Sequence, residues 1–174
     1  MKKLIISLTL MFVILSVSAE KAESPGEFSS PNIGVGVIVA NLAKSVDFYT
    51  HVIGMTKIRD FAVTKEKATE LGLSDKFKLD VTVLKLEDND CANEWKLMSF
   101  GTKSNHPKQN FIHDDTGMQY ITINVKHLNP FIDRIKKAGI DFLNGGESAS
   151  LGNGNYFVLI QDPDGNFIEI IGPK

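Results

Sequence analysis

Hydrophobic residues recur with two different periods along the chain, and the pattern predicts the same series of elements twice. In the first half, strands and helical segments are predicted over residues 33–39, 42–53, 55–63, 65–73, 77–87 and 95–100, where 65–73 is a short helix or turn. In the second half, a strand, a helix, a strand and turn, and two closing strands are predicted over residues 120–125, 131–139, 140–146, 156–161 and 166–171. Each half therefore contains one main helix and four strands.

The two main helices carry signals at both ends. Asn41 precedes the first apolar face and suits an N-cap, and Gly54 follows its last periodic residue. Asn129-Pro130 combines a cap residue with a proline in the favoured first turn, and Gly139 stops the second helix. These signals predict where the helices begin and end.

Near its end the chain reads QDPDGNFIEI, in which Asp162-Pro163-Asp164-Gly165 has the chemistry of a type I turn. Strand-forming residues flank the turn, so a closing hairpin is predicted. Glu169 is a lone carboxylate in an otherwise apolar strand. An unpaired buried carboxylate is costly, so we expect Glu169 to have a metal, a protein cation or water as its partner.

The two halves form a weak internal repeat. When residue 34 is laid on residue 120, Leu42 falls on Leu128 and Asp47 falls on Asp133. Two such units, each with one apolar sheet face, would bury those faces together. The pattern predicts an α+β domain made of two similar modules.

Composition narrows the range of partners and covalent links. The chain has 174 residues and a net charge of −2, without a basic cluster, so nothing indicates binding to nucleic acid. Its single cysteine, Cys91, has no partner for an internal disulfide. The acidic run at 87–90 disfavours a thiolate at that position, which argues against a reactive role for Cys91.

The first 19 residues have the features of a signal peptide. Lys2-Lys3 is followed by the apolar run 4–17 and by a small-residue cleavage pattern that ends at Ala19. The alternative is an uncleaved anchor, but the run is shorter than the roughly 20 apolar residues that span a membrane. We predict cleavage after Ala19, export to the periplasm or medium without a stable membrane anchor, and a flexible lead-in at 20–32.

Residues 33–58 and 155–173 resemble the opening and closing motifs of the vicinal oxygen chelate superfamily, which includes glyoxalase I, extradiol dioxygenases and bleomycin resistance proteins. The resemblance implies two βαβββ modules whose sheets curl into a cup that holds a small ligand. It places the domain at 33–173, with module one at 33–101, a linker at 102–118 and module two at 119–173.

The resemblance also implies four metal-ligand positions, two from each module, usually occupied by His or Glu. In this chain they are Gly34, Lys96, Tyr120 and Glu169, and only Glu169 keeps a ligand. A divalent metal normally has three or four protein ligands of His, Asp, Glu or Cys type. We therefore expect no cofactor, and a divalent metal is disfavoured.

Lys96 and Glu169 are equivalent in the repeat, which suggests that the lysine ammonium neutralises the carboxylate at the vacant metal position. The alternative is that Lys96 extends to solvent and Glu169 lies near the rim. Tyr120 is expected to point into the cup, either to donate a hydrogen bond or to fill space. Trp95 lies next to Lys96 on the opposite strand face, so we place it outside the cup.

Three functional readings follow. The preferred one is an exported protein that binds, or converts without a metal, a small and partly apolar molecule through Lys96, Tyr120 and Glu169, with Glu169 as the candidate catalytic group. The second is a metal-dependent lyase or dioxygenase that combines Glu169 with linker residues. Its candidate linker ligands are His106, His113 and Asp114, although the linker also reads as a solvated loop.

The third reading is a purely structural or partner-binding module. A homodimer is left open, as is the question whether the modules pair within one chain or between two chains.

Overall fold

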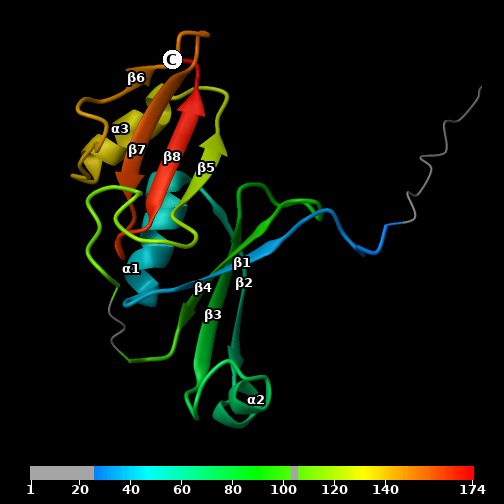
Figure 1. Cartoon of the computed structure of the whole chain (residues 1–174). Coiled ribbons are helices and arrows are strands. Elements are labelled where there is room, and N and C mark those ends of the chain that lie inside the picture. Colours follow the sequence, from blue (N-terminus) through cyan, green and yellow to red (C-terminus); the bar gives the residue numbers. More distant parts are fainter. Residues whose placement is uncertain (1–25, 103–105) are drawn as a thin grey trace, which may run out of the picture.

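The computed structural model describes residues 26–102 and 106–174 (Figure 1). The predicted signal peptide and the lead-in as far as residue 25 lie outside the described residues. In the two described ranges, no helix has both the length and the apolar character needed to cross a membrane.

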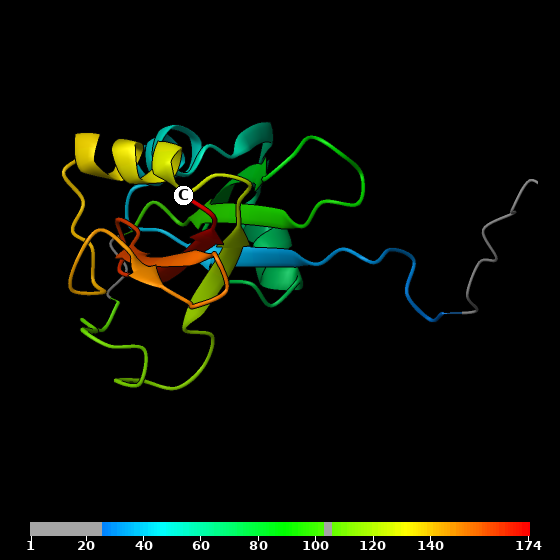
Figure 2. The same ribbon diagram turned by 90° about the horizontal axis from the view of Figure 1, so that it is seen from above.

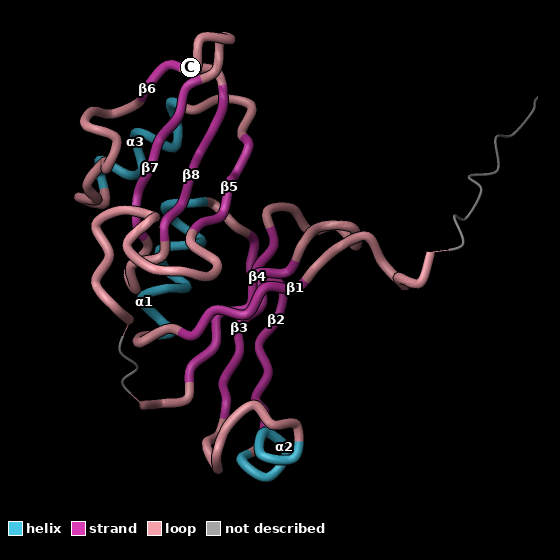
Figure 3. Tube along the Cα trace, viewed as in Figure 1, coloured by secondary structure: helices cyan, strands magenta, loops and turns pink. Residues whose placement is uncertain are grey.

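Module one forms a single four-stranded sheet with two short helical segments. Its elements are β1 (Gly34–Ile38), α1 (Leu42–Asp47), η1 (Phe48–Ile53), β2 (Thr56–Val63), α2 (Lys65–Glu70), β3 (Leu79–Lys85) and β4 (Glu94–Ser99). The strand order is β1-β4-β3-β2, in which β1 runs parallel to β4 and the other pairs are antiparallel (Figure 3).

Module two repeats this topology. Its elements are β5 (Tyr120–Asn124), α3 (Asn129–Lys137), β6 (Ala149–Ser150), β7 (Tyr156–Gln161) and β8 (Phe167–Gly172). The order β5-β8-β7-β6, with β5 parallel to β8, matches that of module one. The α+β fold of two βαβββ modules, predicted from the repeat and the family resemblance, is confirmed.

Of the strand and turn predicted at 140–146, the turn is present at Gly145, which has a φ of 75°, but the strand is wrong. The segment meets β7 through only two bonds. Leu143 N donates to the carbonyl oxygen of Leu159 at 2.8 Å, and Leu159 N donates to Asn144 Oδ1 at 3.2 Å. The edge of this sheet is instead the two-residue strand β6.

The helix predicted at 42–53 is present, but its hydrogen bonding changes halfway. Asn41 Oδ1 accepts from Lys44 N at 3.0 Å, as expected for the cap, and Gly54 ends the helix with a left-handed φ of 89°. The second half, η1, is a π-helix. In the other module, Leu128 rather than Asn129 is the cap residue of α3, so that prediction is off by one.

The main core lies on one face of both sheets, beneath α1, η1 and α3, which occupy the same side of the molecule (Figure 2). Tyr49 of η1, Leu97 of β4, Ile135 of α3 and Ile168 of β8 are fully buried there. On the other face of the module-one sheet lies a smaller buried cluster of Leu79, Val81 and Val83. Side chains alternate along each strand, so Lys96 and Glu169 lie on the opposite faces. We call these two opposite faces the cup faces.

The DPDG turn joins the modules. Gly165 N donates to the Asp162 carbonyl oxygen at 3.1 Å, which confirms the turn, and the Tyr49 hydroxyl of module one donates to Asp162 Oδ2 at 2.8 Å. Asp164 accepts from Ala40 N at 2.9 Å and from Ser45 Oγ at 3.0 Å. Burial, followed by the nearby Asp162 carboxylate, raises the pKa of Tyr49, so its hydroxyl stays protonated and donating.

Candidate functional site

The strand register confirms which positions of the two modules correspond. Gly36 is the partner of Lys96 in the first sheet, and Thr122 is the partner of Glu169 in the second. Gly34 and Tyr120 are the first residues of β1 and β5. The four positions given by the family pattern therefore occupy matching places on the cup faces.

In module one, Lys96 belongs to a cluster of three charged side chains. Lys96 Nζ lies 3.1 Å from Glu94 Oε2, and Arg59 Nη2 donates to Glu94 Oε1 at 2.8 Å. A Cβ added at Gly34 would lie 2.8 Å from Lys96 Nζ, so the ammonium occupies the space of the missing side chain. The predicted pair of Lys96 with Glu169 is wrong, because Lys96 pairs with Glu94 of its own strand.

Glu94 stays ionised in this cluster. Partial burial raises the pKa of its carboxyl group, but the hydrogen bonds and charges of Arg59 and Lys96 outweigh that effect and leave the pKa below its ordinary value. The cluster thus holds two cations and one anion. Its net charge is positive.

In module two, Glu169 has a neutral partner. Glu169 Oε2 accepts from the Thr122 hydroxyl at 2.7 Å, and its side chain is half-buried. Tyr120 is 46% exposed. This arrangement matches the alternative in which Glu169 lies near the rim, where water reaches the rest of the carboxylate.

The residues at the four family positions do not fit a divalent metal. Gly34 offers no donor atom, Lys96 is a cation, and Glu169 is the only carboxylate among the four. Across the described part of the chain, no three His, Cys, Asp or Glu side chains lie close enough together to hold an ion.

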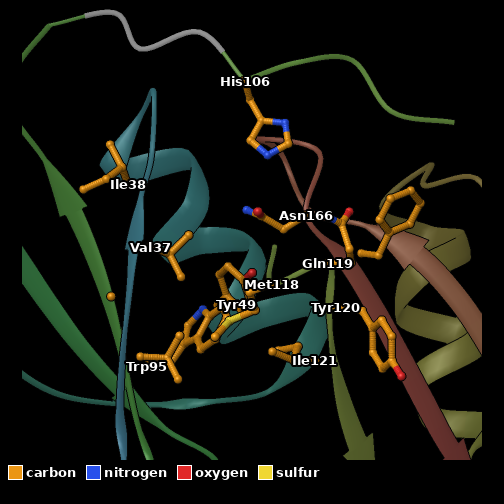
Figure 4. Close-up of a pocket in the computed structure, with 13 residues that line it drawn as sticks. Val37, Ile38, Tyr49, Trp95, His106, Met118, Gln119, Tyr120, Ile121 and Asn166 are labelled. Atoms are coloured by element: carbon orange, nitrogen blue, oxygen red, sulfur yellow. The ribbon is translucent and has the colours of Figure 1, made fainter. Parts of the chain in front are cut away.

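A cavity of about 250 Å³ lies between β1 and β5, the edge strands of the two sheets (Figure 4). Val37 and Ile38 of β1 and Ile121 of β5 supply apolar walls. Tyr49 and Trp95 lie at its base. The cavity therefore opens where the two modules meet.

Polar groups surround the same cavity. Gln119 and Tyr120 contribute from the start of β5, Asn166 from the end of the DPDG turn, and His106 from the linker. Trp95 Nε1 is buried and has no hydrogen-bond partner among the described residues. A few polar groups against apolar walls is the usual composition of a small-molecule site.

The structure brings together only some of the predicted site residues. Tyr120 and His106 line the cavity, but Lys96 and Glu169 do not. Trp95 lies on the helix-covered face of β4, as predicted, yet its ring reaches the cavity through the gap between the sheets, so it is not outside the site.

The other linker candidates lie elsewhere. Asp114 Oδ2 accepts from the backbone N–H groups of Asn110 and Phe111 at 2.8 and 3.0 Å, which folds the linker on itself. The His113 ring stacks on Phe111 with 5.5 Å between ring centroids. Neither residue lines the cavity.

Gln119 and Asn166 were missed. No pattern in the sequence places them at the cavity, because the spacing of β1 and β5 depends on the packing of the core beneath the helices. Part of the linker is also packed against module two, although its polar composition suggests a solvated loop. Gln109, which is 9% exposed, donates to Gln119 Oε1 at 2.9 Å and accepts from Gln161 through its carbonyl oxygen at 3.0 Å.

Comparisons with known proteins agree with this architecture. The model of the Glyoxalase/Bleomycin resistance protein/Dioxygenase superfamily matches residues 34–170. A lactoylglutathione lyase of Pseudomonas putida is 27% identical over 148 residues, which are 78% of this chain and 80% of that protein.

Solved structures share the fold at lower identity. A glyoxalase family protein of Bacillus cereus superposes with a TM-score of 0.68 at 16% identity, covering 87% of this chain and 98% of the other. Glyoxalase I of Leishmania major, described as trypanothione-dependent, superposes with a TM-score of 0.55 at 19% identity, covering 80% of this chain and 84% of the other.

Proposed function

The chain belongs to the glyoxalase/bleomycin resistance protein/dioxygenase superfamily, and from this premise we propose that it binds a small, partly apolar molecule without a divalent metal. The proposed site is the cavity between β1 and β5. The observation that carries the proposal is that this cavity combines apolar walls with the polar groups of Gln119, Tyr120 and Asn166.

The size and chemistry of the cavity limit the ligand. Its volume of about 250 Å³ is near the lower end for small-molecule sites, so a compact molecule is favoured. Val37 and Ile121 would contact the apolar part of the ligand. Tyr120 and Asn166 provide hydrogen-bonding groups that would fix its orientation.

Binding of a small molecule is better supported than its chemical conversion. Glu169, the candidate catalytic group, is held by Thr122 and lies outside the residues that line the cavity. A general base must come within hydrogen-bond reach of the proton that it removes. We therefore propose recognition as the primary activity, in a protein that is exported after cleavage behind Ala19.

A second candidate is a metal-dependent lyase, because the Pseudomonas putida relative is a lactoylglutathione lyase. The donor set argues against it, since Gly34 and Lys96 stand at two of the four ligand positions. This candidate requires about one tightly held metal ion per chain, and that ion should be lost on Glu169→Ala.

The test is a thermal-unfolding screen of the purified protein with indole, phenol, benzyl alcohol and hexanol, with and without Zn²⁺, Ni²⁺, Mn²⁺ and Fe²⁺. A ligand that binds only the folded state raises the free energy of unfolding by about 2.7 kcal/mol at one hundred times its Kd. We expect stabilisation by at least one organic probe, with no dependence on the metals.

Ile38→Trp places a larger ring at the cavity wall, and because Ile38 is 40% exposed we expect the protein to fold with this change. We expect it to abolish the stabilisation by the probe. The control is Leu151→Trp, at a position 47% exposed and outside the cavity lining. Equal probe responses in both variants would rule out this cavity, and stabilisation only with a metal would favour the lyase.

A further inference from the structure

The charged cluster of β2 and β4 contains one more cation than its carboxylate needs. Arg59 and Lys96 both contact Glu94, and the three residues lie on the cup face, because Arg59 and Lys96 are each register partners of Val83. One cation would suffice to neutralise Glu94. The second leaves a net positive charge on this face of module one.

The lack of a side chain at Gly34 determines where the Lys96 ammonium lies. Lys96 starts on β4, but its Nζ lies over Gly34 of the neighbouring strand β1, where a Cβ would approach it to 2.8 Å. The strand β1 forms one wall of the cavity. The absence of a side chain at position 34 therefore brings the ammonium to the strand that borders the proposed binding site.

The Lys96 ammonium keeps donors for a further partner. It has three N–H donors, and its one contact with a carboxylate in the described structure is the 3.1 Å approach to Glu94. Its side chain is 34% exposed, so it is partly withdrawn from water but still reachable. Hydrogen bonds between such a cation and an anionic oxygen are shorter and about twice as strong as neutral ones.

The opposite cup face has the opposite charge. Glu169 of β8 accepts from Thr122 and has no cation within ion-pair distance among the described residues. An anionic group would be repelled by Glu169 and attracted by Lys96 and Arg59. A ligand with one charged end would therefore be bound in a single orientation.

We propose that the ligand carries an anionic group, a carboxylate or a phosphate, which extends out of the cavity across Gly36, the lining residue that is the register partner of Lys96, and is bound there by Lys96 with Arg59. This inference rests on the proposed function, because it assigns the charge of the molecule that the cavity holds. The positive face takes the place that a metal cation has in the family pattern.

The test compares four probes with the same apolar chain: hexanoate, hexyl phosphate, hexanol and hexylamine. Affinities are measured by isothermal titration calorimetry with the purified protein. We expect hexanoate or hexyl phosphate to bind about tenfold or more tightly than hexanol, and hexylamine to bind most weakly. The two anionic probes distinguish a carboxylate ligand from a phosphate ligand.

Two variants test the residues. Lys96→Met removes the charge while Arg59 still pairs with Glu94, and Gly34→Ala keeps the charge but displaces the flexible end of Lys96. Both should lower the affinity for the anionic probe about tenfold and leave that for hexanol unchanged. The control is Lys78→Met, which removes a lysine 2.9 Å from Asp80 outside the cup.

The outcomes separate this inference from the proposed function. Equal affinity for hexanoate, hexyl phosphate and hexanol, lost on Ile38→Trp, would overturn the anionic ligand and leave the cavity as the binding site. A loss of affinity for the anionic probe in Lys78→Met as large as in Lys96→Met would also overturn it. Failure of all four probes to bind, together with no stabilisation by indole, phenol or benzyl alcohol, would overturn both proposals.

Discussion

Lys96 and Glu169 occupy matching places on β4 and β8, yet each contacts a side chain of its own module. The strand register makes the two positions equivalent, but their partners differ. Glu94 lies two residues from Lys96 on the same strand face, and Arg59 reaches it from β2 next to an irregularity in the register between residues 57 and 59. These local contacts make Glu94, and not Glu169, the partner of Lys96.

The ionisation of Glu94 links the charged cluster to the pH dependence of stability. Its pKa is below the ordinary value in the folded protein, so its contribution to stability is present above the ordinary pKa. That contribution is lost as the pH falls through the lowered pKa. Lys96→Met removes one of the two cations and should raise the pKa of Glu94.

The measurement is a titration of the Glu94 carboxyl carbon by NMR, combined with urea unfolding across the acid range. In Lys96→Met, the acid loss of stability that Glu94 causes should be smaller and should be complete at a higher pH than in the native protein, because the folded-state pKa moves toward its ordinary value. Lys78→Met serves as the control, because its partner Asp80 is outside the cluster. An unchanged titration of Glu94 in Lys96→Met would show that Arg59 alone holds the carboxylate.

Among the elements, those with end signals were predicted best. Asn41 and Gly54 bound the first helix as expected, because a cap and a left-handed terminus are set by local chemistry. The switch to a π-helix at Phe48 has no local signal, since it accompanies the packing of Tyr49 against the turn of the other module. The strand predicted at the start of 140–146 is absent, because the local turn at Gly145 prevails over the apolar residues before it.

The contact between η1 and the DPDG turn predicts the effect of Tyr49→Phe. Asp162 is 6% exposed, and this change removes the donor at 2.8 Å from its carboxylate. Asn166 Nδ2 still donates to the same oxygen, so the expected loss in the free energy of unfolding is about 1–3 kcal/mol. Urea unfolding measures it.

Tyr156→Phe is the matched control, because it removes a hydroxyl from a half-buried tyrosine on β7, away from the turn. Similar losses of stability in both variants would mean that the bond to Asp162 contributes little. The turn would then connect the modules through Asp164 alone.

For the whole molecule, the repeat and the family resemblance were sufficient to predict the α+β fold and the matching strand orders. The separation of the two sheets was not predictable from them. The cavity depends on how far apart the cores beneath α1, η1 and α3 hold β1 and β5, and hydrophobic periodicity gives the face of each strand but no distance between strands. Tyr120 was therefore predicted as a site residue, whereas Gln119 was missed.

Export is a proposal for the whole chain, and it has a direct test. When the full chain is expressed in a bacterium with a signal peptidase, the mature protein should begin at Glu20 and appear outside the cytoplasm. Intact-mass measurement of fractionated cells gives the first residue. A chain that stays in the membrane fraction with Met1 intact would identify the segment as an anchor.

The edges of β1 and β5 face each other across the cavity and belong to separate sheets, without the backbone ladder that joins neighbouring strands. The spacing of these edges is held by side chains, chiefly the helix core and the bonds of Asp162 and Asp164. The gap between β1 and β5 can therefore widen for a bulkier ligand. This requires repacking of side chains but breaks no hydrogen bond within either sheet. Because side chains rather than backbone hydrogen bonds join the two modules, we expect the cavity to accept ligands of different width.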